Sequence, residues 1–145
     1  MALPIPVPGL VIRYSYLWLA EHRRGQEEGV KDRPCAVVLT TTMEEGRLSV
    51  VVVPTTHAPP DDPRLAVEIP AAVKRRLGLD DERSWVMLTE ANRFTWPGPD
   101  LRPVRRGDLS SIAYGPLPYR LFEEIRQGFI QALKERRAGW LPRTE

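Results

Sequence analysis

The sequence predicts a mainly β (α+β) fold: a small antiparallel β-barrel, with a short helix after the fourth strand and a long C-terminal helix. Three observations predict it. Fifteen prolines among 145 residues are too many for a helical bundle and indicate many turns. Several short segments are rich in valine, tyrosine and threonine, which favour strands. Close to the C-terminus, apolar residues recur at helical spacing instead, so we expect a curled sheet capped by helices.

The first half of the chain contains three strand candidates. Residues 11–18 alternate between apolar and polar side chains, which is the period of a half-buried strand. Residues 35–41 form the second candidate. Residues 48–53 form the third, and their nearly unbroken valine run indicates a strand covered on both faces. The polar loop 21–33 is long for a hairpin connection, and long loops are often functional.

The middle of the chain predicts a short strand followed by a helix. Residues 66–69 form the strand, and Pro70 then begins a helix because proline suits the first helical turn. Gly78 ends the helix. The basic run 74–76 is interpreted as its solvated face.

The last third predicts two strands and the terminal helix. The strands are residues 85–89 and 93–96, and they flank the segment Glu90-Ala91-Asn92. The helix extends from about residue 118 to 137. Its apolar stripe consists of Leu121, Phe122, Ile125, Phe129 and Leu133.

Length and composition indicate one globular domain, residues 1–145. The net charge of +2 excludes a polybasic nucleic-acid coat but allows a local basic patch. The single cysteine, Cys35, cannot form an internal disulfide, and its apolar neighbours predict a buried, inert thiol. No segment is apolar over the roughly 20 residues that a membrane span needs, and the N-terminus does not resemble a signal peptide. We therefore expect a cytoplasmic protein.

Motifs for cofactor binding are missing from the sequence. There is no glycine-rich phosphate loop. The two histidines, His22 and His57, are not at metal-ligand spacing, and one cysteine does not complete a zinc site. The sequence predicts neither a metal nor a nucleotide cofactor.

Polar residues gather at the ends of two predicted strands. Arg33 directly precedes the second strand, and Thr55, Thr56 and His57 directly follow the third. If these strands are antiparallel neighbours, the start of one lies beside the end of the other. Arg33 and Thr55 then face each other, and the loop 21–32 lies above them.

This group suits phosphodiester transfer within RNA. The reaction needs a group that accepts the 2′-hydroxyl proton, a group that protonates the leaving oxygen and a cation near the phosphate. Arginine suits phosphate geometry, and histidine titrates in the useful range. Each residue also has a structural interpretation. Arg33 suits a solvated loop, the threonine hydroxyls suit bonds to turn backbone, and His57 suits an exposed turn. Trp18, Trp85 and Trp96 suit the core.

The order of short motifs resembles the MazF/PemK toxins of bacterial type II toxin–antitoxin modules over roughly residues 9–112. The motifs are Gly9-Leu10-Val11, the loop Gly25-Gln26-Glu27-Glu28-Gly29, Arg33-Pro34 before an apolar strand, Val53-Pro54-Thr55-Thr56, and Glu90-Ala91-Asn92-Arg93. One departure is Leu10, which stands where the family has an acidic residue. The loop before Arg33 is also longer, and the helix 70–77 and the turn 96–99 are more elaborate than in short members.

The resemblance implies an SH3-like barrel, a homodimer and a cognate antitoxin as partner. It implies an endoribonuclease that cleaves single-stranded RNA, including mRNA, without a metal or other cofactor and so arrests growth. Arg33 and Thr55 match the family's catalytic pair, and His57 is the candidate base. The residues expected to contact RNA are His22, Arg23, Arg24, Gln26, Thr56, Asn92 and Arg93.

Two alternatives remain open from the sequence. One is a non-catalytic binding protein with the same fold, either a gyrase-poisoning toxin of the CcdB kind or an RNA-binding member without nuclease activity. Leu10 and the longer loop motivate it. The other is a barrel whose terminal helix docks on another protein.

Overall fold

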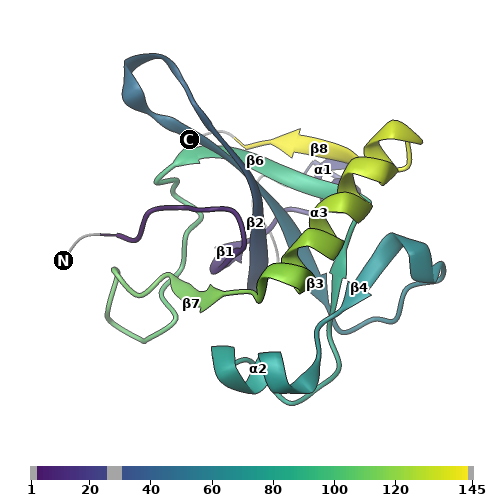
Figure 1. Cartoon of the computed structure of the whole chain (residues 1–145). Helices are drawn as coiled ribbons and strands as arrows, with labels where there is room; N and C mark the ends of the chain where they lie inside the picture. Colours follow the sequence, from purple (N-terminus) through teal and green to yellow (C-terminus); the bar gives the residue numbers. More distant parts are fainter. Residues whose placement is uncertain (1–2, 26–30, 144–145) are drawn as a thin grey trace.

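The computed structural model describes residues 3–25 and 31–143 (Figure 1). The elements in chain order are β1 (Leu10–Ser15), α1 (Leu19–Arg23), β2 (Asp32–Thr42), η1 (Glu44–Gly46), β3 (Leu48–Thr56), η2 (Pro63–Leu65), β4 (Ala66–Glu68), α2 (Ala71–Leu77), β5 (Trp85–Met87), β6 (Glu90–Trp96), β7 (Ala113–Pro116), α3 (Tyr119–Lys134) and β8 (Gly139–Pro142).

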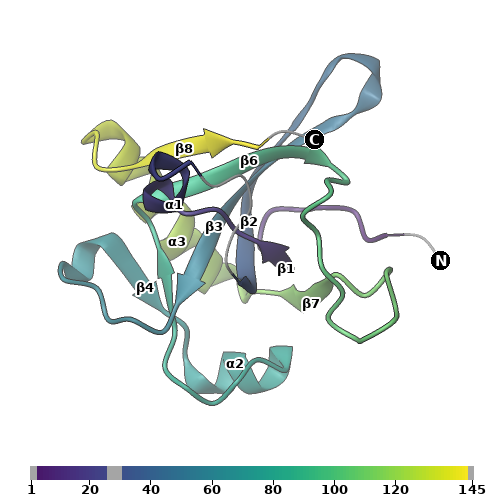
Figure 2. The same cartoon turned by 180° about the vertical axis from the view of Figure 1, so that it is seen from behind.

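The strands form one sheet that curls into a half-barrel, as Figures 1 and 2 show from opposite sides. Its main path is β4-β5-β3-β2-β1-β7. Strand β3 pairs with β2 along one edge, whereas its other edge pairs first with β6 and then, from Thr55, with β5. Because β3 changes partner along its length, the sheet bends there. All pairings are antiparallel except that of β6 with β8, and the predicted fold class is confirmed.

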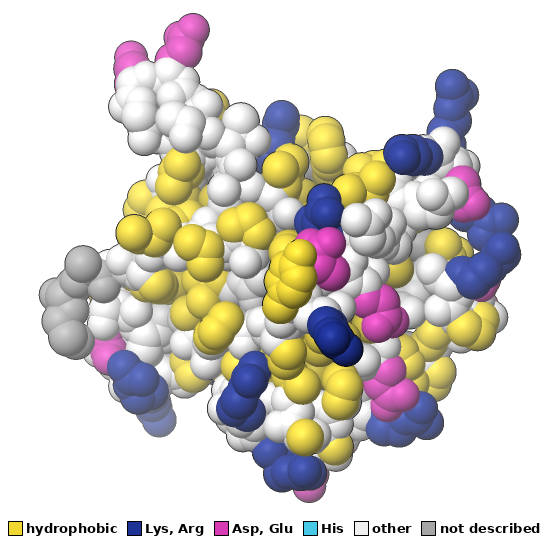
Figure 3. Space-filling model, viewed as in Figure 1, with side chains coloured by type: hydrophobic (Ala, Val, Ile, Leu, Met, Phe, Trp, Pro, Cys, Tyr) yellow, Lys and Arg dark blue, Asp and Glu magenta, His cyan; other side chains and the backbone are white. Residues whose placement is uncertain are grey.

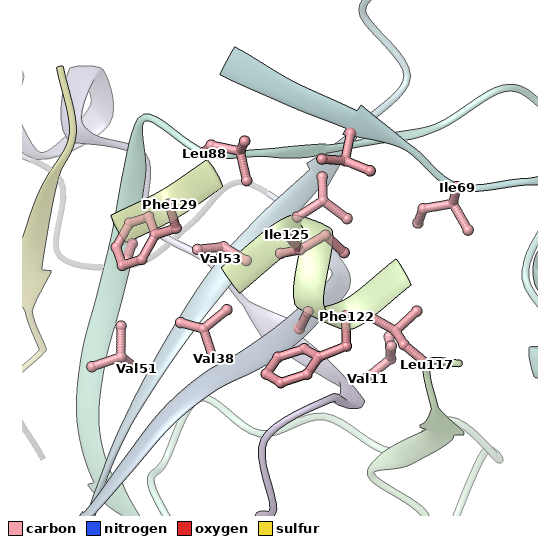
Figure 4. Close-up of a cluster of buried hydrophobic side chains, with 14 of the residues drawn as sticks. Val11, Val38, Val51, Val53, Ile69, Leu88, Leu117, Phe122, Ile125 and Phe129 are labelled. Carbon is pink, nitrogen blue, oxygen red and sulfur yellow. The ribbon is translucent and has the colours of Figure 1, made fainter. Parts of the chain in front are cut away.

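The core lies on both faces of β3. Val51 and Val53 face the cluster beneath α3, whereas Val50 and Val52 face the inside of the half-barrel together with Tyr14. Figure 4 shows Val51 and Val53 on the side that α3 covers. All four valines are at most 3% exposed, so the prediction of a strand covered on both faces is confirmed.

Helix α3 packs across one face of the sheet through its apolar stripe. Phe122, Ile125 and Phe129 are buried there (Figure 4). A Cβ atom at Gly128 would lie 2.5 Å from Cδ1 of Leu88, closer than atoms pack in a protein core. The glycine therefore allows α3 to approach the segment between β5 and β6.

Three predicted boundaries are wrong. Helix α1 begins at Leu19 and extends into the segment 21–33, which was predicted as a loop. Strand β6 begins at Glu90, so the segment 90–92 belongs to a strand and does not separate two strands. Strand β3 continues through Thr55 and Thr56, which were expected after its end. In the last two cases pairing with a neighbouring strand extends the element beyond its apolar run.

The structure agrees with two simpler expectations. Cys35 is 0% exposed, and burial raises the pKa of its thiol. Within the described residues, no helix combines the length and apolar character needed to cross a membrane.

Candidate functional site

A pocket of about 290 Å³ opens where β2 begins and β3 ends. Arg33 and Pro34 of β2 line one side of it. Thr55 and Thr56 at the end of β3, and His57 directly after it, also line the pocket. The opposite wall comes from α2 and the loop behind it. The structure thus brings together the four polar residues that the strand topology predicted to be neighbours. Their chemical roles stay predictions.

The guanidinium of Arg33 is held between an aromatic ring and a backbone carbonyl. Its Cζ atom lies 4.9 Å from the ring centroid of Trp18, and its Nη1 donates to the carbonyl oxygen of Thr55 over 3.1 Å. Cation–π contacts of this kind contribute about 0.5–2 kcal/mol. Among the described residues, the buried Nε has no hydrogen-bond partner. Arg33 therefore carries a permanent positive charge in one fixed orientation at the pocket.

The two threonine hydroxyls both bond to backbone. Thr55 is 6% exposed, and its Oγ1 donates to the carbonyl oxygen of Pro34 over 2.8 Å. The Oγ1 of Thr56 accepts from the amide of Ala58 over 3.1 Å, as hydroxyls at turns often do. A hydroxyl that donates still has lone pairs, so Thr55 retains the ability to accept a hydrogen bond.

His57 lies between two carboxylates. Its Nε2 is 2.9 Å from Oδ2 of Asp80, and its Nδ1 is 3.4 Å from Oε2 of Glu82. The imidazole is about half exposed. The hydrogen bond from Lys74 lowers the pKa of Asp80, and the nearby His57 lowers it further, so Asp80 is ionised at neutral pH.

Lys74 is buried, which corrects the prediction that the basic run of α2 is solvated. Lys74 is 4% exposed, and its ammonium donates to Oδ1 of Asp80 and to Oγ of Ser84, each over 2.6 Å. It also donates to the carbonyl oxygen of Glu82. An ammonium has three donors, so all of them are used, as burial of a charge requires. The sequence did contain a signal for this burial. Lys74 lies three residues before the buried Leu77, and this spacing places both side chains on the same face of the helix.

Two residues of the pocket, together with a neighbouring acid outside its lining, have the chemistry of metal ligands. In the described ranges, His57, Asp80 and Glu82 offer ligand atoms that all lie within 4.8 Å of one another. The sequence spacing of the histidines did not predict this group, since two of its members come from a different loop. The ammonium of Lys74 already neutralises part of the negative charge of Asp80.

Asn92 corrects the list of expected RNA contacts. It is 0% exposed, and its amide bonds to the backbone nitrogen and oxygen of Leu17 and to Arg143. Asn92 therefore holds the chain after β1 against β6 and has no surface with which to contact RNA.

Of the other expected RNA contacts, Thr56 lines the pocket, whereas the remaining described ones lie outside it. His22 and Arg23 are exposed on α1, and Arg24 follows at its end. Arg93 is exposed on β6. Gln26 lies outside the described residues.

Besides the residues of α2 and its following loop, sequence reasoning missed Arg13 of β1 and Tyr114 of β7. Arg13 adds positive charge to the lining and Tyr114 adds an aromatic ring. Lys31, in the loop that was predicted to lie over the site, adds a second cation. Burial raises the pKa of Tyr114. Arg13 projects from the polar side of the first strand and so had a periodic signal, whereas Tyr114 belongs to a strand that was not predicted.

Comparison with known proteins identifies the family. The model of PemK-like, MazF-like toxins of type II toxin–antitoxin systems matches residues 15–94, more than half of the chain. This range contains Arg33, Thr55 and His57 and also the α2 wall of the pocket. A comparison with curated proteins gave no match. The match agrees with the resemblance drawn from the motifs, and the chain therefore belongs to the PemK-like, MazF-like family of toxins from type II toxin–antitoxin systems.

Proposed function

We propose that this chain is an endoribonuclease that cleaves single-stranded RNA in the pocket between β2, β3 and α2. The observation that carries the proposal is that the guanidinium of Arg33, the hydroxyl of Thr55 and the imidazole of His57 line this one pocket. RNA cleavage of this type needs no metal, because the 2′-hydroxyl of RNA supplies the nucleophile.

The proposed reaction is a transfer of the phosphodiester to the neighbouring 2′-oxygen. The 2′-oxygen bonds to phosphorus, the bond to the 5′-oxygen breaks, and a cyclic phosphate and a free 5′-hydroxyl result. His57 accepts the 2′-hydroxyl proton as general base. Arg33 stabilises the charge that develops on the phosphate oxygens. Thr55 orients the phosphate by turning its hydroxyl proton from the carbonyl of Pro34 to a phosphate oxygen. The leaving 5′-oxygen takes a proton from a solvent water, and the imidazolium of His57 then returns its proton to the solvent.

The dimensions and charge of the pocket favour a single strand. Its volume of about 290 Å³ lies near the lower end of small-molecule sites, roughly 300 Å³, which suits one phosphate with part of its nucleotide. Arg13 and Lys31 supply cations for the neighbouring phosphates. Leu10, the departure from the family pattern, is 8% exposed in the core inside the half-barrel and does not line the pocket. It therefore gives no reason to prefer a binding protein over an enzyme.

The family supplies the expected partners. A toxin of a type II module has an antitoxin partner, and we propose that the antitoxin competes with RNA for this pocket. We also propose that the toxin acts as a homodimer in the cytoplasm and arrests growth by cutting mRNA.

The test is cleavage of structured and unstructured RNA by the purified chain in the presence of a chelator. We expect cuts in single-stranded regions, and a loss of about 100-fold or more in kcat for Arg33→Ala, the usual effect of removing a group that stabilises an oxyanion. Arg64→Ala is the matched control, because Arg64 is an exposed arginine that pairs with Asp62 and does not line the pocket. Intact RNA, or equal cleavage by Arg33→Ala, would refute the proposal. DNA breaks in expressing cells with intact mRNA would instead favour a gyrase-poisoning toxin.

A further inference from the structure

We infer that Asp80 is a positioning residue that fixes the proton arrangement of His57, and that the buried Lys74 holds Asp80 in place. The catalytic role that we assign to this contact rests on the proposed function. The contacts that carry it lie in the wall that α2 and its following loop add to the pocket.

The anchor is the ammonium of Lys74. Helix α2 ends at Gly78, whose φ of 73° is left-handed, a conformation that glycine adopts without strain. The chain therefore turns back, and the amide of Leu79 bonds to the carbonyl of Lys74 over 2.9 Å. This reversal carries the loop 80–84 over the end of the Lys74 side chain, where Asp80 and Ser84 accept its protons.

Asp80 uses its two oxygens for different partners. Oδ1 accepts from Lys74 and from the amide of Glu82, over 2.6 and 3.1 Å. Oδ2 lies 2.9 Å from Nε2 of His57. An ionised carboxylate only accepts hydrogen bonds, so Nε2 is the ring nitrogen that carries a proton. In the neutral imidazole the lone pair then lies on Nδ1.

This arrangement suits a base whose second nitrogen is oriented by a carboxylate. When Nδ1 takes the proton of the 2′-hydroxyl, the ring becomes an imidazolium with donors on both nitrogens. Asp80 accepts from one of them, and Glu82, with Oε2 3.4 Å from Nδ1, is within reach of the other. The side chain of Glu82 is 70% exposed, so it moves aside for substrate more easily than Asp80, which has three partners.

The first test is Asp80→Asn. An asparagine of the same shape keeps an oxygen toward Lys74 and turns its amide donor toward His57, so Nε2 must accept and the proton moves to Nδ1. We expect a fall in kcat of roughly 100-fold, the lower range for loss of general base catalysis, with KM changed by no more than about twofold because phosphate binding stays with Arg33. Asp81→Asn, the adjacent exposed acid, is the matched control and should leave both parameters unchanged.

A double variant separates positioning from a general structural effect. If Asp80 acts through His57, Asp80→Asn costs nothing further in a His57→Ala background, since the two residues work as a unit. An equal loss in both backgrounds would overturn the inference. So would unchanged kcat in Asp80→Asn when Arg33→Ala and His57→Ala are both impaired.

The proton arrangement is also measurable without RNA. The chain has only two histidines, His22 and His57, so nitrogen NMR of the imidazoles is assignable with a His22→Asn variant. We expect the neutral His57 ring to carry its proton on Nε2 in the wild type and on Nδ1 in Asp80→Asn. The same tautomer in both would refute the role of Asp80, whereas a wild type that cuts no RNA but shows the tautomer change would refute only the proposed function.

Unfolding midpoints measured alongside identify a variant that fails to fold. Lys74→Met then supplies a second perturbation of Asp80, for which we expect a mixture of tautomers.

Discussion

At the scale of single residues, the pocket depends on side chains that have structural contacts as well as proposed chemical roles. Arg33 stacks on Trp18 and bonds to the backbone of Thr55. Thr55 in turn bonds to the backbone of Pro34. These bonds cross between β2 and β3, so the two residues that the proposal makes catalytic also fix each other's position. Such pre-organisation is what a site needs to stabilise a transition state.

A substitution at Thr55 tests whether its hydrogen bond to Pro34 stabilises the fold. Thr55→Val keeps the shape but leaves the carbonyl of Pro34 without its hydroxyl donor, so we expect the free energy of unfolding to fall by about 1–2 kcal/mol. Thr55→Ser keeps the donor and should cost clearly less. Urea unfolding with unchanged m-values measures both. A valine variant as stable as the wild type would mean that the bond to Pro34 contributes nothing net.

The sequence predicted the positions of site residues that follow from strand topology. It did not predict the positions of residues that depend on the path of a loop. Arg33 and Thr55 are neighbours because antiparallel strands must place the start of β2 beside the end of β3. Lys74 belongs to a run of three basic residues, and charge patterning assigns such a run to solvent, although position 74 shares a helix face with the buried Leu77. Only the reversal at Gly78 brings Asp80 and Ser84 to it, and no local pattern specifies that path.

At the scale of elements, α1 is attached to the sheet by a partly buried acid. Glu90 of β6 accepts from the amide of Leu19 at the start of α1 and from the hydroxyl of Tyr16, over 3.0 and 3.1 Å. Trp18, whose ring lies over Arg33, sits between these two contacts in sequence. The carboxylate thereby couples the position of α1 to the side of the pocket.

Glu90→Gln tests this attachment through its pH dependence. Burial raises the pKa of Glu90 above its ordinary 4.5. The stabilising contribution of the protonated group is therefore present below that value and is lost as the pH rises through the raised pKa. Glutamine keeps an acceptor but does not ionise. We expect the free energy of unfolding of the wild type, relative to Glu90→Gln, to decline as the pH rises above 4.5 and through the raised pKa, as denaturant unfolding over a series of pH values would measure. A difference that rises with pH would contradict the assignment.

The strength of the local pattern decided which elements the sequence predicted. The long periodic segment of α3 was located to within a few residues because its apolar stripe repeats over several turns. Strands β7 and β8 have four residues each, two of which are glycine and proline, so too few apolar residues remain for a periodic signal. Pairing with β1 and β6 stabilises them. These partners are distant in sequence, so a local pattern does not reveal the pairing. Helix α1, with five residues, was missed for the same reason.

At the scale of the whole molecule, charge and apolar surface are distributed differently. On the face seen in Figure 3, cationic and anionic side chains are mixed, in keeping with the net charge of +2. Large apolar side chains are exposed in the N-terminal segment, at Ile5 and Val7, and on β2 and its hairpin, at Leu39 and Met43. Under the proposed function, the attraction for RNA therefore comes from the local cations of the pocket and not from the protein's overall field.

The C-terminal end of the described chain closes the half-barrel through one buried arginine. Arg143 pairs with Asp100 over 2.9 Å, with side chains only 3% and 8% exposed. It also donates to the carbonyl of Ser15 and to Asn92. One side chain thus connects the end of β1, the middle of β6 and the loop after it. These residues are far apart in sequence, so no local pattern predicts the contact.

Removing this arginine should be costly for the whole fold. Arg143→Ala leaves the buried carboxylate of Asp100 without its guanidinium, and breaking a buried pair from one side typically costs about 3–5 kcal/mol, a large part of the roughly 5–15 kcal/mol that stabilises a domain. Arg137→Ala is the control, because Arg137 pairs with Asp62 at the surface, where such pairs contribute at most about 1 kcal/mol. Adding Asp100→Asn to Arg143→Ala should restore part of the loss, because the remaining side chain is then neutral. Denaturant unfolding followed by tryptophan fluorescence measures all three, and equal stability of the two arginine variants would mean that Arg143 does not hold the half-barrel closed.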